Sequence, residues 1–184
     1  MKQRISILVA VMAIALVGVS AAFAGTVTAT ATVSAGNSGN LALSLPSNPS
    51  MSDTLDGTDQ TATYTLPLSL NDVRGSGAGW NLTITSTAFT TGSHSLANTA
   101  STITSLTTAC VTGGTCTNPT NAIAYPLTVP AAASAPTAVK LFDAAAGTGL
   151  GRFTITPTVS VAIPGNSYAG SYSSTVTIAA VSGP

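Results

Sequence analysis

The sequence predicts an all-β protein, an antiparallel β-sandwich of the Greek-key or immunoglobulin-like type, preceded by a signal-peptide helix. Charged residues make up only 5% of the chain and glutamate is absent, so the residues that helices place on exposed faces are nearly missing. Threonine and valine, which suit a pleated surface, alternate along much of the chain. Turns rich in glycine, proline, asparagine and serine divide this pattern into about nine or ten short strands.

Residues 1–24 have the organisation of a secretory signal peptide. A basic start, Met1–Arg4, precedes an apolar run over residues 5–18, and Ala22-Phe23-Ala24 supplies small residues where a signal peptidase reads. We expect cleavage after Ala24, a single domain over residues 25–184, and a secreted, cell-surface or extracellular location. An uncleaved membrane anchor is the alternative, because the apolar stretch approaches the roughly 20 residues that span a bilayer. That segment would then be the only contact with a membrane.

The charge beyond the leader argues against one class of partner. Three basic residues, Arg74, Lys140 and Arg152, stand against five aspartates, which leaves a net charge of −2. Nucleic-acid binding needs clustered cations that displace condensed counterions. We therefore expect no nucleic-acid partner.

The first expected strand, Gly25–Ser34, alternates strictly between apolar residues and threonine, with Val27, Ala29, Ala31 and Val33 on one face. A glycine-rich connection over residues 71–79 makes the third and fourth expected strands neighbours, and a Pro164-Gly165-Asn166 turn makes the last two a pair. The strands expected after the first are Leu41–Leu45, Thr61–Leu70, Trp80–Thr87, Ala122–Val129, Ala138–Phe142, Phe153–Ile163 and Ser171–Val181.

Cys110 and Cys116 bracket a glycine-containing turn between two threonine-rich segments, which predicts a disulfide across the neck of a hairpin. Its short loop removes little entropy from the unfolded chain, so the bond should fix a local hairpin. A closed zinc site needs four ligands, and His94 is the only histidine. We expect no metal and no cofactor.

No catalytic residues are expected. The serines lack a G-x-S-x-G setting, and His94 would need a pocket shared with at least two aspartates, so we interpret it as an exposed polar residue. Asp53, Asp56 and Asp59 lie in one short segment with Gly57, but their spacing is not that of a calcium loop. We interpret these acids as solubilising residues that discourage edge-to-edge pairing, with a calcium site as the alternative.

Residues 73–84, VRGSGAGWNLTI, resemble the first motif region of the WxL-domain surface proteins of Gram-positive bacteria, with Trp80-Asn81-Leu82 as the W-x-L. The similarity extends to residues 41–46, 144–151 and 168–177. The resemblance implies a non-enzymatic, β-rich domain that attaches non-covalently to peptidoglycan, often alongside other surface proteins. The second W-x-L of the family falls on Ile178-Ala179-Ala180 here, so the second aromatic is missing.

We therefore expect an exported structural or binding protein that associates non-covalently with the cell wall, through peptidoglycan or another surface polymer, with other surface proteins as further partners. Glycines before Trp80 allow positive φ and let a partner approach the backbone, but they fit equally a tight crossover that buries Trp80 as a core anchor. An N-glycosylation pattern at Asn81-Leu82-Thr83 is interpreted as chance. The expected binding residues are Arg74, Gly75, Gly77, Gly79, Trp80 and Leu82.

The alternative function is a self-assembling extracellular filament or matrix subunit. Residues 26–33 could complete the sheet of a neighbouring copy by donor-strand exchange and form a homopolymer, with the alternate apolar residues filling pockets. Those residues are Val27, Ala29, Ala31 and Val33.

Overall fold

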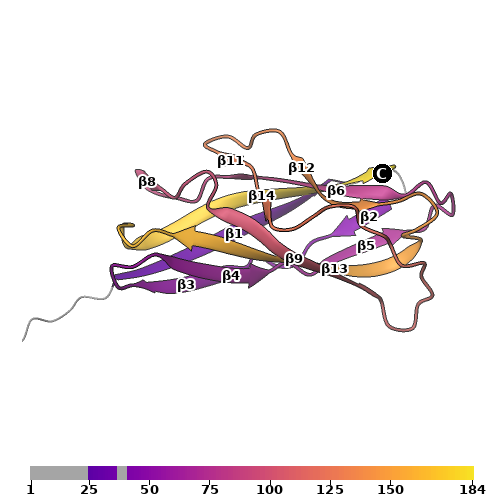
Figure 1. The fold of residues 1–184 in the computed structure, drawn as a ribbon, viewed down its shortest axis with the longest axis horizontal. Helices are drawn as coiled ribbons and strands as arrows, with labels where there is room; N and C mark the ends of the chain where they lie inside the picture. Colours follow the sequence, from indigo (N-terminus) through magenta and orange to yellow (C-terminus); the bar gives the residue numbers. More distant parts are fainter. Residues whose placement is uncertain (1–24, 37–40) are drawn as a thin grey trace, which may run out of the picture.

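The computed structural model describes residues 25–36 and 41–184, with the backbone alone for residues 33–36, and it confirms the predicted β-sandwich (Figure 1). The predicted signal peptide and its helix, residues 1–24, lie outside the described residues. Within those residues, no helix is long and apolar enough to span a membrane.

The first sheet has the strand order β11-β6-β14-β1-β3. Strand β12 also pairs with β6, and the short β7–β8 hairpin extends from β14. Its strands are β1 (Gly25–Gly36), β3 (Ser50–Leu55), β6 (Trp80–Thr87), β7 (Thr90–Thr91), β8 (His94–Ser95), β11 (Ala131–Ala132), β12 (Val139–Ala144) and β14 (Gly170–Ser182).

The second sheet has the order β10-β9-β13-β5-β2, and β4 pairs with β13 beyond the part that β5 covers. Its strands are β2 (Leu41–Ser44), β4 (Gln60–Thr65), β5 (Leu68–Asp72), β9 (Ser101–Cys110), β10 (Leu127–Thr128) and β13 (Gly151–Ile163).

The core lies between the sheets and consists of the inward residue of each alternating pair. Strand β13 buries every second residue from Phe153 to Ile163, and β14 does the same from Tyr172 to Ala180. The predicted period of two is therefore confirmed along both long strands. The largest fully buried side chains include Trp80, Phe142, Phe153, Leu66, Leu68, Leu70, Leu82, Ile84, Ile103 and Leu141.

Strand β1 has neighbours on both sides within its own chain. It runs parallel to β14, from Val27 beside Gly170 to Gly36 beside Ala179, and antiparallel to β3. The side chains of Val27, Ala29 and Ala31 are buried, while that of Val33 lies outside the described part. Because both edges of β1 are occupied, the structure gives no support to the filament alternative. This parallel pairing and that of β11 with β6 depart from a purely antiparallel sandwich.

Two predicted neighbour relations are wrong because the chain crosses between the sheets. The expected strand Thr61–Leu70 is two strands, β4 and β5, interrupted at Leu66-Pro67, where Leu66 N–H donates to Pro157 O at 3.0 Å. Both belong to the second sheet, whereas β6 belongs to the first. The expected final pair, β13 and β14, is likewise divided between the sheets. Strand β3, at the edge of the first sheet, was not predicted.

The predicted disulfide is present between Cys110 and Cys116, whose Cα atoms are 6.0 Å apart. The hairpin around it is not. Strand β9 ends at Cys110 beside Phe153 of β13, and the chain after the disulfide returns only as an isolated bridge between Thr117 and Leu150. Of the expected strand at residues 122–129, only β10 is formed, and an isolated bridge at Asn121 lies just before it.

Candidate functional site

Three segments meet at one end of the sandwich: the β5–β6 loop (residues 73–79), the β12–β13 loop (residues 145–150) and the end of β14 with the residues after it (181–184). We call them the glycine-rich end. Backbone hydrogen bonds join them directly, from Gly147 N to Gly77 O at 2.7 Å and from Gly183 N to Gly79 O at 3.1 Å. The three segments therefore form one connected surface.

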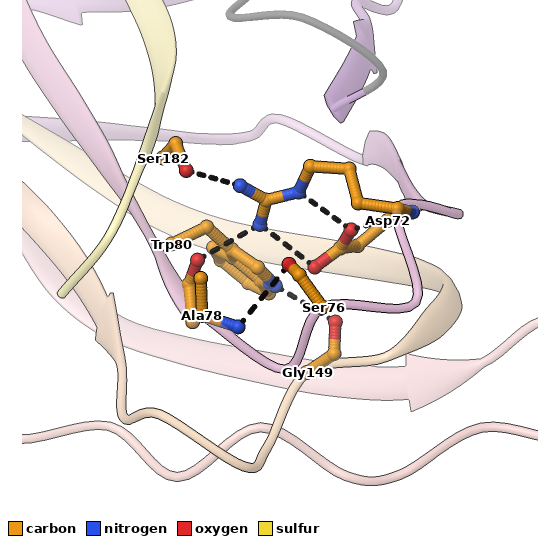
Figure 2. A network of polar contacts seen from close by, with 8 residues as sticks. Asp72, Ser76, Ala78, Trp80, Gly149 and Ser182 are labelled. Atoms are coloured by element: carbon orange, nitrogen blue, oxygen red, sulfur yellow. Dashed lines mark hydrogen bonds and ion pairs between the residues drawn. The ribbon is translucent and has the colours of Figure 1, made fainter.

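A buried ion pair holds this end together. The side chain of Asp72 is fully buried at the end of β5, and that of Arg74 is only 13% exposed. Arg74 donates from Nε to Asp72 Oδ1 at 2.8 Å and from Nη2 to Asp72 Oδ2 at 2.9 Å, which is bidentate geometry. The guanidinium also donates to Gly79 O at 2.8 Å and to the hydroxyl of Ser182. Figure 2 shows Asp72 and Ser182 on either side of the guanidinium.

The ion pair changes the protonation equilibria of both residues. The hydrogen bonds from Arg74 hold the pKa of the Asp72 carboxyl below its ordinary value, and Asp72 raises the pKa of the guanidinium. Because Asp72 lies in the second sheet and Ser182 in the first, Arg74 connects the two sheets. The side chain of Arg74 thus forms its hydrogen bonds within the domain.

Trp80, the first residue of β6, is a core residue. It is 0% exposed and stacks on Phe142, with ring centroids 5.1 Å apart and an interplanar angle of 19°. Its indole Nε1 donates to Gly149 O at 2.8 Å (Figure 2). Leu82 is also 0% exposed. Neither side chain is exposed, so neither can touch a polymer directly in this structure. Trp80 and Leu82, which we expected among the binding residues, support the loops from beneath the surface.

The glycines divide by what surrounds them. Gly79 has φ +72°, and a Cβ there would lie 3.0 Å from the carbonyl carbon of Ala145. Gly149 has φ +71°, and a Cβ there would lie 2.5 Å from Trp80 Nε1. Gly75 has φ +67° with no atom within 4 Å of that position, so it faces open space. Only glycine satisfies both the conformation and the contact at Gly79 and Gly149.

The outer surface of the glycine-rich end consists of small, uncharged residues. Among the expected binding residues, Gly75 is exposed, Gly77 partly exposed and Gly79 buried. Two apolar side chains that the sequence did not single out, Val73 and Val181, are 67% and 41% exposed. The sequence indicated the second loop only through the similarity of residues 144–151 to the WxL-domain proteins. The exposed residues are Val73, Gly75, Ser76, Ala78, Ala145, Ala146, Gly147, Val181, Ser182 and Pro184.

The position of the missing second motif is internal. Ile178 is 0% exposed and Ala180 is 2% exposed, and they lie beside Ile84 and Leu82 of the neighbouring strand β6. The residue that replaces the second aromatic is thus part of the core, as Trp80 is.

The remaining sequence candidates lie elsewhere. Asp56 accepts hydrogen bonds from Thr58 and Gln60, Asp59 accepts one from Gly165 N, and within the described residues no three acids, histidines or cysteines are grouped to hold a metal. The bonds from Thr58 lower the pKa of Asp56. Asp53 lies on the edge strand β3, where an acid discourages pairing with another sheet.

The glycosylation pattern falls on a covered residue. Asn81 is 7% exposed, and its amide donates to Gly183 O at 2.8 Å. A folded domain does not present this side chain.

Comparison with known proteins identifies one family. A family model described as WxL domain, surface cell wall-binding, matches residues 24–178, which includes both loops of the glycine-rich end and ends at Ile178, the first residue of the second motif's position. No curated protein sequence matches the chain.

Proposed function

Because this chain belongs to the WxL family of surface cell wall-binding domains, we propose that it is an exported, non-enzymatic protein that attaches non-covalently to a wall polymer through the glycine-rich end. Peptidoglycan is the first candidate polymer and another surface polymer the second. Other surface proteins are a further class of partner.

The observation that carries this proposal is the combination of exposed backbone with a rigid support. Gly75 and Gly147 have open space around them, so a polymer can approach their peptide groups. The Arg74–Asp72 pair and the Trp80–Gly149 hydrogen bond fix the same loops from below. A surface that is already ordered loses little conformational entropy on binding.

The uncharged character of this end indicates the kind of contact. Its exposed residues are glycine, alanine, serine, valine and proline, and among the described residues of these three segments only Arg74 has a charged side chain, with its charge paired to Asp72. Hydrogen bonds from peptide groups and packing against Val73 and Val181 would therefore hold the polymer, with weak dependence on salt.

Co-sedimentation of residues 25–184 with purified walls tests the proposal. Ser76→Arg and Ala146→Arg place a large side chain on exposed positions of the two loops, and Thr63→Arg places the same side chain on the exposed face of β4 as the control. We expect the loop variants to bind walls at least about ten-fold more weakly, a loss of about 1.4 kcal/mol. The control variant Thr63→Arg should be retained as well as the wild type is. Equal retention of all three would reject the glycine-rich end as the contact.

Comparing retention on two wall preparations identifies the polymer. Retention on peptidoglycan stripped of attached polymers and proteins supports peptidoglycan as the ligand. Retention on intact walls that is lost after stripping assigns the contact to an attached polymer or protein. No retention on either preparation rejects wall binding by this chain.

A further inference from the structure

A second surface feature lies at the opposite end of the sandwich from the glycine-rich end. A pocket of about 270 Å³ opens between the β7–β8 hairpin and the β13–β14 turn, and Figure 1 shows β8 and the C-terminus at opposite ends of the molecule. The pocket is lined by Ser93, His94, Ser95, Leu96, Pro164, Asn166, Ser167, Tyr168 and Tyr172.

An aromatic pair forms one wall of this pocket. The rings of His94 and Tyr168 are stacked, with centroids 3.6 Å apart and an interplanar angle of 11°. Tyr168 is nevertheless 61% exposed, and the other exposed large apolar residues of the described chain, Val73 and Val181, belong to the glycine-rich end. His94 covers one face of the Tyr168 ring, so the exposed area of Tyr168 lies on the rest of the residue.

The pocket is built on a fixed frame. Tyr172 is 2% exposed and donates from its hydroxyl to Tyr168 O at 3.0 Å, and Ser167 N donates to Pro164 O at 2.9 Å. Asp59 accepts a hydrogen bond from Gly165 N at 2.9 Å, which ties the turn to the β3–β4 loop. The exposed ring is therefore held in place before any ligand arrives.

The polar groups around the ring are neutral and available. The hydroxyls of Ser93, Ser95 and Ser167 and the amide of Asn166 form no side-chain hydrogen bond with any other residue in the described ranges. No aspartate, lysine or arginine is part of the lining. The lining therefore has no charged side chain to pair with an ion and no carboxylate to pair with His94.

We propose that this pocket binds a neutral saccharide, with one sugar ring packed against the exposed part of Tyr168. A pyranose has an apolar C–H face that suits an aromatic ring, and hydroxyl or acetamido groups that suit hydroxyl and amide side chains. The volume of about 270 Å³ lies just below the usual range of ligand pockets, which suits one sugar ring of a longer saccharide. The site is separate from the proposed wall contact, so a polymer that reached both would bind with added avidity.

His94 provides a direct reporter because it is the only histidine in the chain. Residues 25–184 are titrated with a neutral β-1,4-linked N-acetylglucosamine tetramer and with cellotetraose, and binding is followed by the imidazole resonances in NMR and by calorimetry. We expect saturable binding of at least one tetramer and a shift of the His94 signals.

Variants locate the binding. Tyr168→Ala should weaken binding at least about ten-fold, while Tyr168→Phe, which keeps the ring, and Thr63→Ala, on the exposed face of β4 away from both sites, should stay within about three-fold of the wild type. Because Tyr168 is largely exposed, the alanine variant should keep the wild-type thermal unfolding curve. No saturable binding of either tetramer by the wild type, or equal binding by folded Tyr168→Ala, would overturn the proposal.

The same variants separate this inference from the wall proposal. Binding of free tetramer together with no retention on walls upholds the pocket and rejects the wall contact. Wall retention that Ser76→Arg abolishes, in a protein that binds no tetramer, upholds the wall contact and rejects the pocket. Tetramer binding that Ser76→Arg leaves unchanged shows that the two sites act independently.

Discussion

The indole Nε1 of Trp80 lies 2.8 Å from the carbonyl oxygen of Gly149, so the first residue of β6 is bonded to the loop that precedes β13. This contact crosses from one sheet to the chain segment that enters the other. It makes the W-x-L tryptophan a structural link between the two loops that we propose as the wall contact.

Replacing Trp80 tests that link. Trp80→Phe keeps a ring to stack on Phe142 but leaves Gly149 O without its donor, and a buried unpaired group costs about 1–3 kcal/mol. Trp80→Ala should cost about 3–5 kcal/mol, because a large cavity opens beside Phe142 and Phe153. Urea denaturation measures both, with Val73→Ala as an exposed control within about 0.5 kcal/mol of the wild type. A Trp80→Ala domain of wild-type stability would contradict the core position.

The two loop glycines Gly147 and Gly149 form a matched pair. Both have positive φ, +79° and +71°, so alanine should cost about 1–2 kcal/mol at each from conformation alone. Only Gly149 has the Trp80 indole where a Cβ would lie, so Gly149→Ala should be clearly the less stable variant in thermal denaturation. Equal melting temperatures would show that the indole can move away at no cost.

The Asp72–Arg74 pair predicts a dependence of stability on pH. Because the folded state lowers the pKa of Asp72, its contribution is present above the unfolded value of about 3.9 and is lost as the pH falls through the lower folded value. Asp72→Asn should cost about 1.5–3 kcal/mol at pH 7, since it removes the charge partner of Arg74, which keeps its hydrogen bonds to Gly79 O and Ser182.

The difference between Asp72→Asn and wild type should narrow below about pH 4 in urea denaturation series. Thr63→Ala on the exposed face of β4 is the control, because neither side chain titrates and its difference from the wild type should not change with pH. A difference that stays constant from pH 7 to pH 3 would show that the charge of Asp72 is not what stabilises the end.

Ile178→Trp, which supplies the missing aromatic residue of the second motif, should lower stability and should not strengthen retention on walls. The side chain of Ile178 is 0% exposed, so a larger ring must fit into a packed core, at about 1–3 kcal/mol. Ile178→Leu, a volume-conserving control, should cost less than about 1.5 kcal/mol. Denaturation and wall co-sedimentation together check this, and tighter wall retention at unchanged stability would contradict it.

The sequence was a good guide to residue faces and a poor guide to strand partners. Period-two alternation in β1, β13 and β14 predicts which residues are buried, because a pleated strand directs successive side chains to opposite faces. The same local pattern carries no information on which sheet a strand joins. The glycine-rich connection from β5 to β6 therefore predicts neighbouring strands, whereas it crosses from the second sheet to the first.

The candidate site shows the same limit. Glycines ahead of Trp80 predicted a special backbone, but whether the ring faced a ligand or the core depended on Gly149 and Phe142, which are distant in the sequence. The stack of His94 on Tyr168 likewise joins β8 to the β13–β14 turn, and neither local sequence indicates the other as its partner.

The parallel pairing of β1 with β14 has a mechanical consequence. The chain enters at Gly25 and leaves beyond Ser182 at the other end of the molecule, so tension between these points pulls the two strands past one another along their length. The backbone pairing between the two strands, from Val27 beside Gly170 to Gly36 beside Ala179, is then loaded in shear. All of these pairs bear the force at once and do not separate one at a time. A domain anchored on one side and pulled from the other is thereby built to resist force along its long axis.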